Sequence, residues 1–182
     1  MRPRGPAGRW RLRALLPVLL LAPALTACGL THLEDLNFRV DDRLHFTAPA
    51  DRALVTTPLT VSWTIRDFRI AAPGSEPPSR NAGYFAVFVD KAPVRPGQSL
   101  DVVANGDTYC EQEPHCPDKA YLNENYVYPT TATHVRLVQA PKVPGKADVQ
   151  LHAITVVLMD TAGHRIGESA WELDVRMRRV GY

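Results

Sequence analysis

Short segments in which apolar residues recur at every second position run through most of the chain. Residues 59–65 are the clearest case, because four apolar side chains alternate with three hydroxyl side chains. A period of two predicts a β-strand with one buried face. Residues 84–89 are apolar on both faces, which predicts a central strand covered on each side. The apolar residues 151–159, a turn at 160–163 and the alternating residues 170–177 predict a β-hairpin.

The rest of the chain contains shorter segments of the same kind, separated by turns rich in proline and glycine. No stretch of ten or more residues has the helical period of 3.6. Turn residues recur every eight to twelve positions, so we expect an all-β fold, either a sandwich or a barrel. The other expected strands are 36–40, 44–47, 100–103 and 133–138, and the expected loops are 71–83 and 141–146.

The N-terminal residues differ in composition from the rest of the chain. Five arginines and no acidic residue occur in residues 1–13, and an apolar run follows at 14–25. A basic region, a short apolar region and small residues before a cut are typical of a secretory signal peptide. The apolar run is interrupted by Pro17 and Pro23 and is shorter than the roughly 20 residues that cross a membrane.

The apolar run ends in Leu25-Thr26-Ala27-Cys28, which resembles the lipobox of bacterial lipoproteins. The resemblance implies cleavage before Cys28, a diacylglyceryl group on its thiol and an acyl chain on the new amine. Two or more chains give stable membrane anchoring. The expected regions are a signal peptide at 1–27, a lipidated tether at 28–43 and a β-sandwich domain at 44–182. The alternative is an ordinary secreted protein.

This resemblance places the protein at the extracytoplasmic face of the cell membrane, with the outer membrane as an alternative. Loss of the signal peptide leaves 16 of the 21 basic residues against 19 acidic ones, a net charge of −3. A mildly acidic domain without a basic patch is not expected to bind nucleic acid. The expected partners are therefore the membrane, through the anchor, and an envelope protein or glycan.

Cys110 and Cys116 remain once Cys28 is assigned to lipid. In an exported protein two such thiols predict a disulfide, here closing a short loop. A metal site that adds Glu111, Glu113 and His115 is the alternative, although structural zinc sites use more closely spaced cysteine pairs.

Two sandwich families share sequence features with this chain. FTAPADRALVTTPLTVSWTI, GYFAVFVD and ITVVLMDTAGHRIGESAWELDV resemble immunoglobulin-like and fibronectin type III-like domains over residues 44–178, with Trp63 and Tyr84 at matching places. The resemblance implies an antiparallel β-sandwich. APADRALV and DTAGHRIG resemble periplasmic copper-resistance sandwiches, which implies metal handling through Asp160 and His164. In that family a mature amino-terminal histidine and a late Asp-x-His motif bind copper. This chain departs in both respects, because Asp160 and His164 are four positions apart and the expected N-terminus is an acylated cysteine.

Catalytic and cofactor-binding motifs are absent from the sequence. None of the five serines lies in Gly-x-Ser-x-Gly, and no His-Glu-x-x-His, Walker or dinucleotide-binding motif occurs. The six histidines are scattered singly along the chain. We therefore expect a protein that is not an enzyme and that carries no cofactor.

Residues 104–129 are the strongest candidate for a binding surface, because they hold four of the six tyrosines. Rigid tyrosines with adaptable amide neighbours are typical of binding loops. The alternative is that Tyr126 and Tyr128 lie on a short strand and cap the core. A structural envelope protein without a specific ligand is a further alternative. The candidate binding residues are Tyr109, Tyr121, Asn123, Tyr126 and Tyr128.

Overall fold

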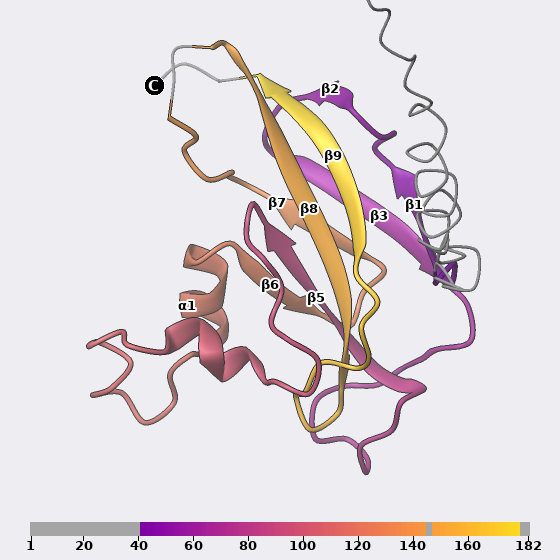
Figure 1. Ribbon diagram of the computed structural model, residues 1–182, viewed down its shortest axis with the longest axis vertical. Coiled ribbons are helices and arrows are strands. Elements are labelled where there is room, and N and C mark those ends of the chain that lie inside the picture. The colour runs from indigo at the N-terminus through magenta and orange to yellow at the C-terminus, as the bar shows by residue number, and fades with distance from the viewer. Residues whose placement is uncertain (1–40, 145–146, 179–182) are drawn as a thin grey trace, which may run out of the picture. The chain divides into compact units, whose positions relative to one another are not determined.

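The computed structural model of the protein describes residues 41–144 and 147–178. The expected signal peptide, Cys28, most of the tether and the expected strand at 36–40 lie outside the described residues. The elements in chain order are β1 (Leu44–Ala48), β2 (Ala53–Val55), β3 (Leu59–Ile65), β4 (Arg69–Ile70), β5 (Ala82–Val89), the 3-10 helix η2 (Leu100–Ala104), α1 (Lys119–Glu124), β6 (Val127–Thr130), β7 (His134–Leu137), β8 (Val149–Asp160) and β9 (Trp171–Arg178) (Figure 1).

The strands form two sheets, which confirms the expected all-β fold. One sheet has the order β1-β3-β7, and the other has the order β2-β9-β8-β5-β4 with β6 also paired to β5. Most pairs are antiparallel, but β2 runs parallel to β9 and β4 runs parallel to β5. The expectation of a wholly antiparallel sandwich was wrong in these two places. The chain crosses from the smaller sheet to the larger one after β1 and again after β3, and β2 and β4 are the short edge strands of the larger sheet.

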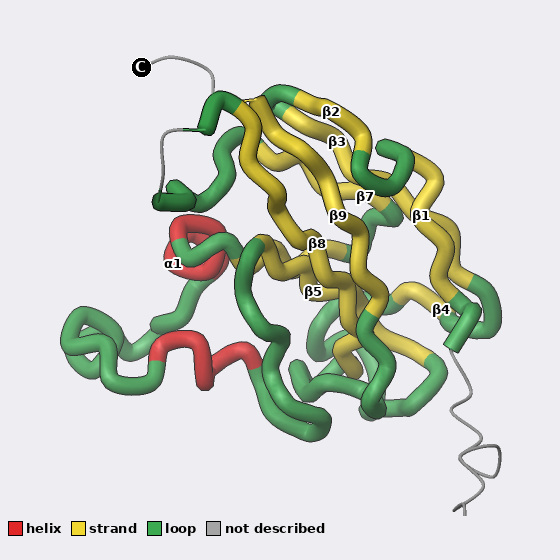
Figure 2. Tube along the Cα trace, turned by 45° about the horizontal axis from the view of Figure 1, so that its top comes forward, coloured by secondary structure: helices red, strands yellow, loops and turns green. Residues whose placement is uncertain are grey.

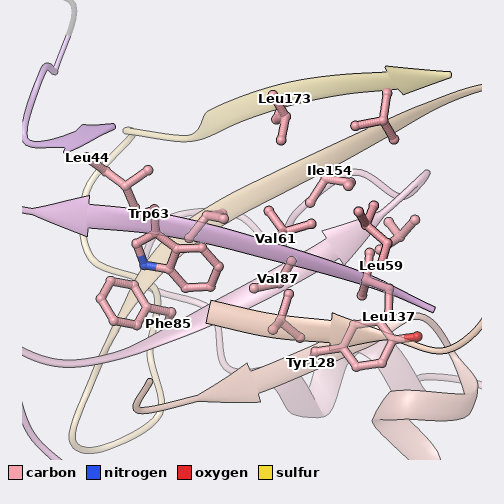
Figure 3. Close-up of a cluster of buried hydrophobic side chains, with 14 of the residues drawn as sticks. Leu44, Leu59, Val61, Trp63, Phe85, Val87, Tyr128, Leu137, Ile154 and Leu173 are labelled. Carbon is pink, nitrogen blue, oxygen red and sulfur yellow. The ribbon is translucent and has the colours of Figure 1, made fainter. Parts of the chain in front are cut away.

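A core of apolar side chains lies between the two sheets. In β3 the side chains of Leu59, Val61 and Trp63 are buried while the residues between them are more exposed, as a period of two requires. The Trp63 ring packs edge-on against Phe85 of β5, with ring centroids 5.3 Å apart (Figure 3). Ile154 of β8 is buried in the same hydrophobic cluster, which therefore contains side chains from both sheets. Each such buried side chain contributes about 1.5–3 kcal/mol to stability.

The opposite face of the larger sheet is also covered. All eight residues of β5 are buried, which confirms the central strand expected at 84–89. Phe88 and the buried Tyr84 belong to a second cluster that includes Leu100 of η2 and Leu122 of α1. Figure 2 shows the segment between β5 and η2 running across the strands beside α1. Tyr84 therefore lies on the opposite face of β5 from the core that holds Trp63, and burial raises its pKa to about 12.

Two expectations for the region after β5 need correction. The segment expected to be a strand at 100–103 is the 3-10 helix η2, whose ends Leu100 and Ala104 are buried in the second layer. The segment expected to be irregular at 104–129 contains α1 and the start of β6. The Asp118 carboxylate caps α1 by accepting the Tyr121 amide at 2.8 Å. A six-residue helix is too short to show a period of 3.6 in the sequence.

Residues 41–43, expected to belong to the tether, are bonded to the domain. The Arg43 guanidinium donates to the Asp41 carboxylate at 2.8 Å, and the Ser169 hydroxyl donates to the same carboxylate at 2.6 Å. The Trp171 indole N–H donates to the Asp41 carbonyl at 2.7 Å. The hydrogen bond from Arg43 lowers the pKa of Asp41 to about 2. Within the described ranges, no helix is long and apolar enough to cross a membrane.

Candidate functional site

The chain between η2 and α1 extends away from the strands and is closed by a disulfide (Figure 1). Cys110 and Cys116 form the bond, with their Cα atoms 5.0 Å apart. The disulfide expected from the sequence is therefore present. It also removes both thiols from the alternative metal site with Glu111, Glu113 and His115.

Asp107 organises this disulfide loop. Its carboxylate accepts the Tyr121 hydroxyl of α1 at 2.7 Å and the Tyr109 amide at 2.9 Å. The hydrogen bond from Tyr121 lowers the pKa of Asp107, and the same bond raises the pKa of Tyr121. An ionised Asp107 thus holds the loop against α1 at neutral pH.

The five candidate binding residues do not form one surface. The side chain of Tyr109 is open to solvent, with 63% of its area exposed. Tyr121 and Asn123 are half-buried in α1. Tyr128 is buried in the core between the sheets, and Tyr126 packs against that core. Because side chains alternate along β6, Val127 and Tyr128 point to opposite faces, and Tyr128 is directed inward (Figure 3).

The expectation that Tyr126 and Tyr128 belong to a binding surface is therefore not supported by their positions. The structure matches the alternative reading, in which they lie at a short strand and complete the core. Tyr126 follows the end of α1 with a φ of 59°, and its amide donates to the Asn123 carbonyl at 3.1 Å. A left-handed residue directly after a helix end is a common way to stop the helix. Its role in this fold is to turn the chain from α1 into β6.

The chain from Asp101 in η2 to the end of α1 is strongly acidic, a feature that does not enter the sequence-based prediction of a binding surface. Residues 101–124 contain six acidic residues and one basic residue, Lys119, a net charge of −5. Glu111 and Glu113 are exposed in the disulfide loop, beside Tyr109. A local charge count of the sequence shows this acidity, whereas residues 28–182 as a whole carry a net charge of only −3.

A surface pocket of about 370 Å³ lies over the face of β5 and β6 that packs against η2 and α1. Its floor contains Phe88 and Val127, and Val102 and Val103 of η2 line it as well. The lining residues are Phe88, Lys91, Ala92, Pro93, Val94, Arg95, Gln98, Val102, Val103 and Val127. None of these residues is acidic. Nine of the ten lining residues lie within residues 88–103, but no motif in that stretch indicates a pocket, and Val127 joins them only in the folded chain.

One wall of the pocket is held by a buried arginine. The Arg165 guanidinium donates to the Val94 carbonyl at 2.6 Å. The Arg165 main chain accepts the Gly97 amide at 2.9 Å and donates to the Gln98 carbonyl at 2.9 Å. The turn at 94–98 is therefore fixed to the β8–β9 connection on both sides.

Asp160 and His164, the pair implied by the resemblance to copper-resistance proteins, lie together in a turn. The Asp160 Oδ1 atom accepts the amides of Ala162 and His164, each at 2.9 Å. The His164 Nδ1 atom is 3.8 Å from the same oxygen. In the described part of the chain no three His, Cys, Asp or Glu side chains are grouped to hold a metal ion. This carboxylate is thus occupied in stabilising the turn between β8 and β9.

Asp90 and His152 form a further pair of titratable residues. The Asp90 carboxylate lies 2.6 Å from His152 Nδ1 and accepts the Ala153 amide at 2.9 Å. His152 is 3% exposed. Within the described residues, no hydroxyl or thiol group is hydrogen-bonded to His152, so the pair has no nucleophile beside it. Its evident effect is to fix the turn after β5 to β8.

No family model, no characterised protein and no solved structure matches this chain.

Proposed function

We propose that this protein is a lipid-anchored, extracytoplasmic binding module without enzymatic activity. The N-terminal pattern that ends at Cys28 supports export and anchoring. The Cys110–Cys116 disulfide supports the same compartment, because disulfides persist in oxidising environments outside the cytoplasm. The single observation that carries the binding role is the acidic disulfide loop, which holds Tyr109 open to solvent.

The anchor is tested by Cys28→Ser. We expect the variant to lose incorporation of labelled palmitate and to leave the membrane fraction for the soluble envelope or the medium. Cys110→Ser is the matched control, since it removes a cysteine that cannot be lipidated in this scheme. A Cys28→Ser protein that still takes up palmitate and stays with membranes would contradict lipid anchoring.

The binding partner that fits the loop is the basic surface of another envelope protein. Six acidic residues against one basic residue over 101–124, with Glu111 and Glu113 in the loop itself, favour attraction to positive charge, and an exposed tyrosine is a common anchor in interfaces. The disulfide and Asp107 hold the loop in one shape, which lowers the entropy lost on binding. We therefore expect association to weaken as salt concentration rises.

A photo-crosslinking amino acid at position 109 tests this surface in living cells. We expect a discrete protein adduct that disappears when Glu111→Gln and Glu113→Gln are added. Val138 is the matched control position, because it is a similarly exposed apolar residue at 65% against 63%. The proposal fails when no adduct forms at 109, or when position 138 gives the same one.

The sandwich itself is proposed to be a variant of the immunoglobulin-like or fibronectin type III-like architecture. Two facing sheets and a buried tryptophan of β3 packed on β5 support this assignment. The structure departs from that architecture in three respects. Two strand pairs are parallel, η2 and α1 form an added layer, and Tyr84 is buried on the face of β5 that this layer covers. An experimental structure in which the β1-β3-β7 sheet did not face the larger sheet would refute it.

A further inference from the structure

The pocket over β5 and β6 combines two properties that together define a class of ligand. The first is an apolar floor. Phe88 and Val127 belong to the second hydrophobic cluster, and the half-buried Val102 and Val103 of η2 pack against the same cluster. Phe88 and Val127 themselves are 1% and 0% exposed, so the apolar surface that solvent reaches in the pocket belongs to Ala92, Pro93, Val102 and Val103.

The second property is a positively charged rim. Lys91 and Arg95 both line the pocket and are exposed. Neither forms an ion pair with a described residue, and the contact of Lys91 Nζ with the Asn125 side-chain oxygen is long at 3.4 Å. Asp101, the acidic residue of η2, does not line the pocket, and its carboxylate accepts the Ser99 hydroxyl at 2.8 Å. The rim therefore carries two cations that are not paired with a carboxylate of the described residues.

The rim is also ordered before any ligand arrives. The Gln98 side-chain oxygen accepts the Arg95 amide at 3.0 Å, which leaves the Gln98 amide N–H₂ group as a further donor at the rim. Arg165 fixes the same turn through the Val94 carbonyl at 2.6 Å. Its buried guanidinium adds positive charge behind the wall. A preformed wall reduces the entropy that a ligand must overcome.

We propose that this pocket binds a small anionic amphiphile, meaning a single apolar chain or ring with one carboxylate or phosphate head group. The apolar part lies on Pro93 and the two valines of η2, above the buried Phe88 and Val127, and the head group lies between Lys91 and Arg95. A volume of about 370 Å³ is near the lower end of ligand pockets, which suits one apolar chain or ring. The site goes beyond the proposed function and depends neither on the anchor nor on Tyr109.

The proposal is tested by calorimetry with decanoate, kept below its micelle concentration. The protein is the full chain with Cys28→Ser, purified from whichever cell fraction contains it, so the result does not depend on lipidation. Decyl phosphate tests whether a phosphate head group is accepted as well. Decyltrimethylammonium and decanol carry the same chain with a positive head and an uncharged head. We expect decanoate to bind at least about tenfold more tightly than either of them.

Variants locate the binding in the pocket. The double variant Lys91→Gln with Arg95→Gln should weaken the binding of decanoate by about tenfold or more, while the binding of decanol stays unchanged. Lys119→Gln with Arg136→Gln is the matched control, because it removes two exposed cations that do not line the pocket. Val103→Trp should abolish binding by filling the floor, with thermal unfolding measured to show that the fold is kept.

Four results would overturn the proposal. These are no heat with any amphiphile below millimolar concentration, equal binding of decanoate and decyltrimethylammonium, unchanged decanoate affinity in the Lys91/Arg95 variant, and an equal loss in the control variant. The first means that the pocket holds no amphiphile. The others mean that apolar contact or overall charge accounts for the binding. None of them bears on the crosslink at Tyr109 or on palmitate at Cys28.

Discussion

Replacing Arg165 with methionine should destabilise the whole domain, because one buried cation donates to three main-chain carbonyls on two separate stretches of the chain. The side chain is 8% exposed overall and donates to the carbonyls of Val94 at 2.6 Å, Glu168 at 2.8 Å and Ser169 at 3.2 Å. Burial lowers the pKa of this guanidinium, but arginine remains charged at any ordinary pH. Methionine keeps the aliphatic part of the side chain and removes the donors.

The size of the effect follows from these bonds. Leaving the Val94 carbonyl buried without a donor costs about 1–3 kcal/mol, and each of the two partly exposed carbonyls loses about 0.5–1.5 kcal/mol. Some of this loss is offset because a charge no longer has to be buried. We expect a net loss of about 2–4 kcal/mol, a large part of the 5–15 kcal/mol typical of a domain.

Urea unfolding followed by tryptophan fluorescence measures this loss. Arg165→Lys should be intermediate, since an ammonium group can reach one of the carbonyls but cannot bridge all three. Arg136→Met is the control, because Arg136 is exposed on β7 and should change stability by less than about 0.5 kcal/mol. Amide exchange should also become faster at residues 94–98 in the methionine variant. An Arg165→Met protein as stable as the Arg136→Met protein would refute the reasoning.

Three other variants give independent tests of the fold. Gly83→Ala should lower stability by about 3 kcal/mol or more, since its new Cβ would lie 1.9 Å from a main-chain oxygen of β8 at a φ of +153°. Gly74→Ala is its control, because nothing lies within 4 Å there and only the backbone cost of about 1–2 kcal/mol applies. Asp41→Asn should remove about 1 kcal/mol at neutral pH after solvent screening is allowed for. Its folded-state pKa of about 2 lies below the ordinary 3.8, so this contribution is present above pH 4 and disappears as the pH falls toward 2. Melting temperatures of the wild type and this variant should therefore converge over that range, and a constant gap would contradict the assignment. Cys110→Ser with Cys116→Ser should cost about 2 kcal/mol in chemical unfolding, the value for closing so short a loop, and no loss would mean that the bond only shapes the loop.

Alternation in the sequence was sufficient to identify the strands that form the core. Residues 59–65 alternate because one face of β3 meets the other sheet, and 84–89 are continuously apolar because β5 is covered on both faces. Both patterns arise from burial, which acts on each position separately and so can be read locally. The same holds for the disulfide, since only two cysteines remained to pair.

Tertiary structure decided everything that depends on which distant segments meet. The sequence by itself determined the all-β class, the long hairpin and the disulfide loop, since their signals lie within neighbouring residues. It could not show that Tyr128 points into the core while Tyr109 stays exposed, because both occur in one tyrosine-rich segment. Nor could it show the pocket, because the turn at 94–98 is held by the distant Arg165 and Val127 joins the floor only in the folded chain. The physical reason is that burial periodicity is local, whereas the grouping of charges around a cavity is set by the packing of the layers.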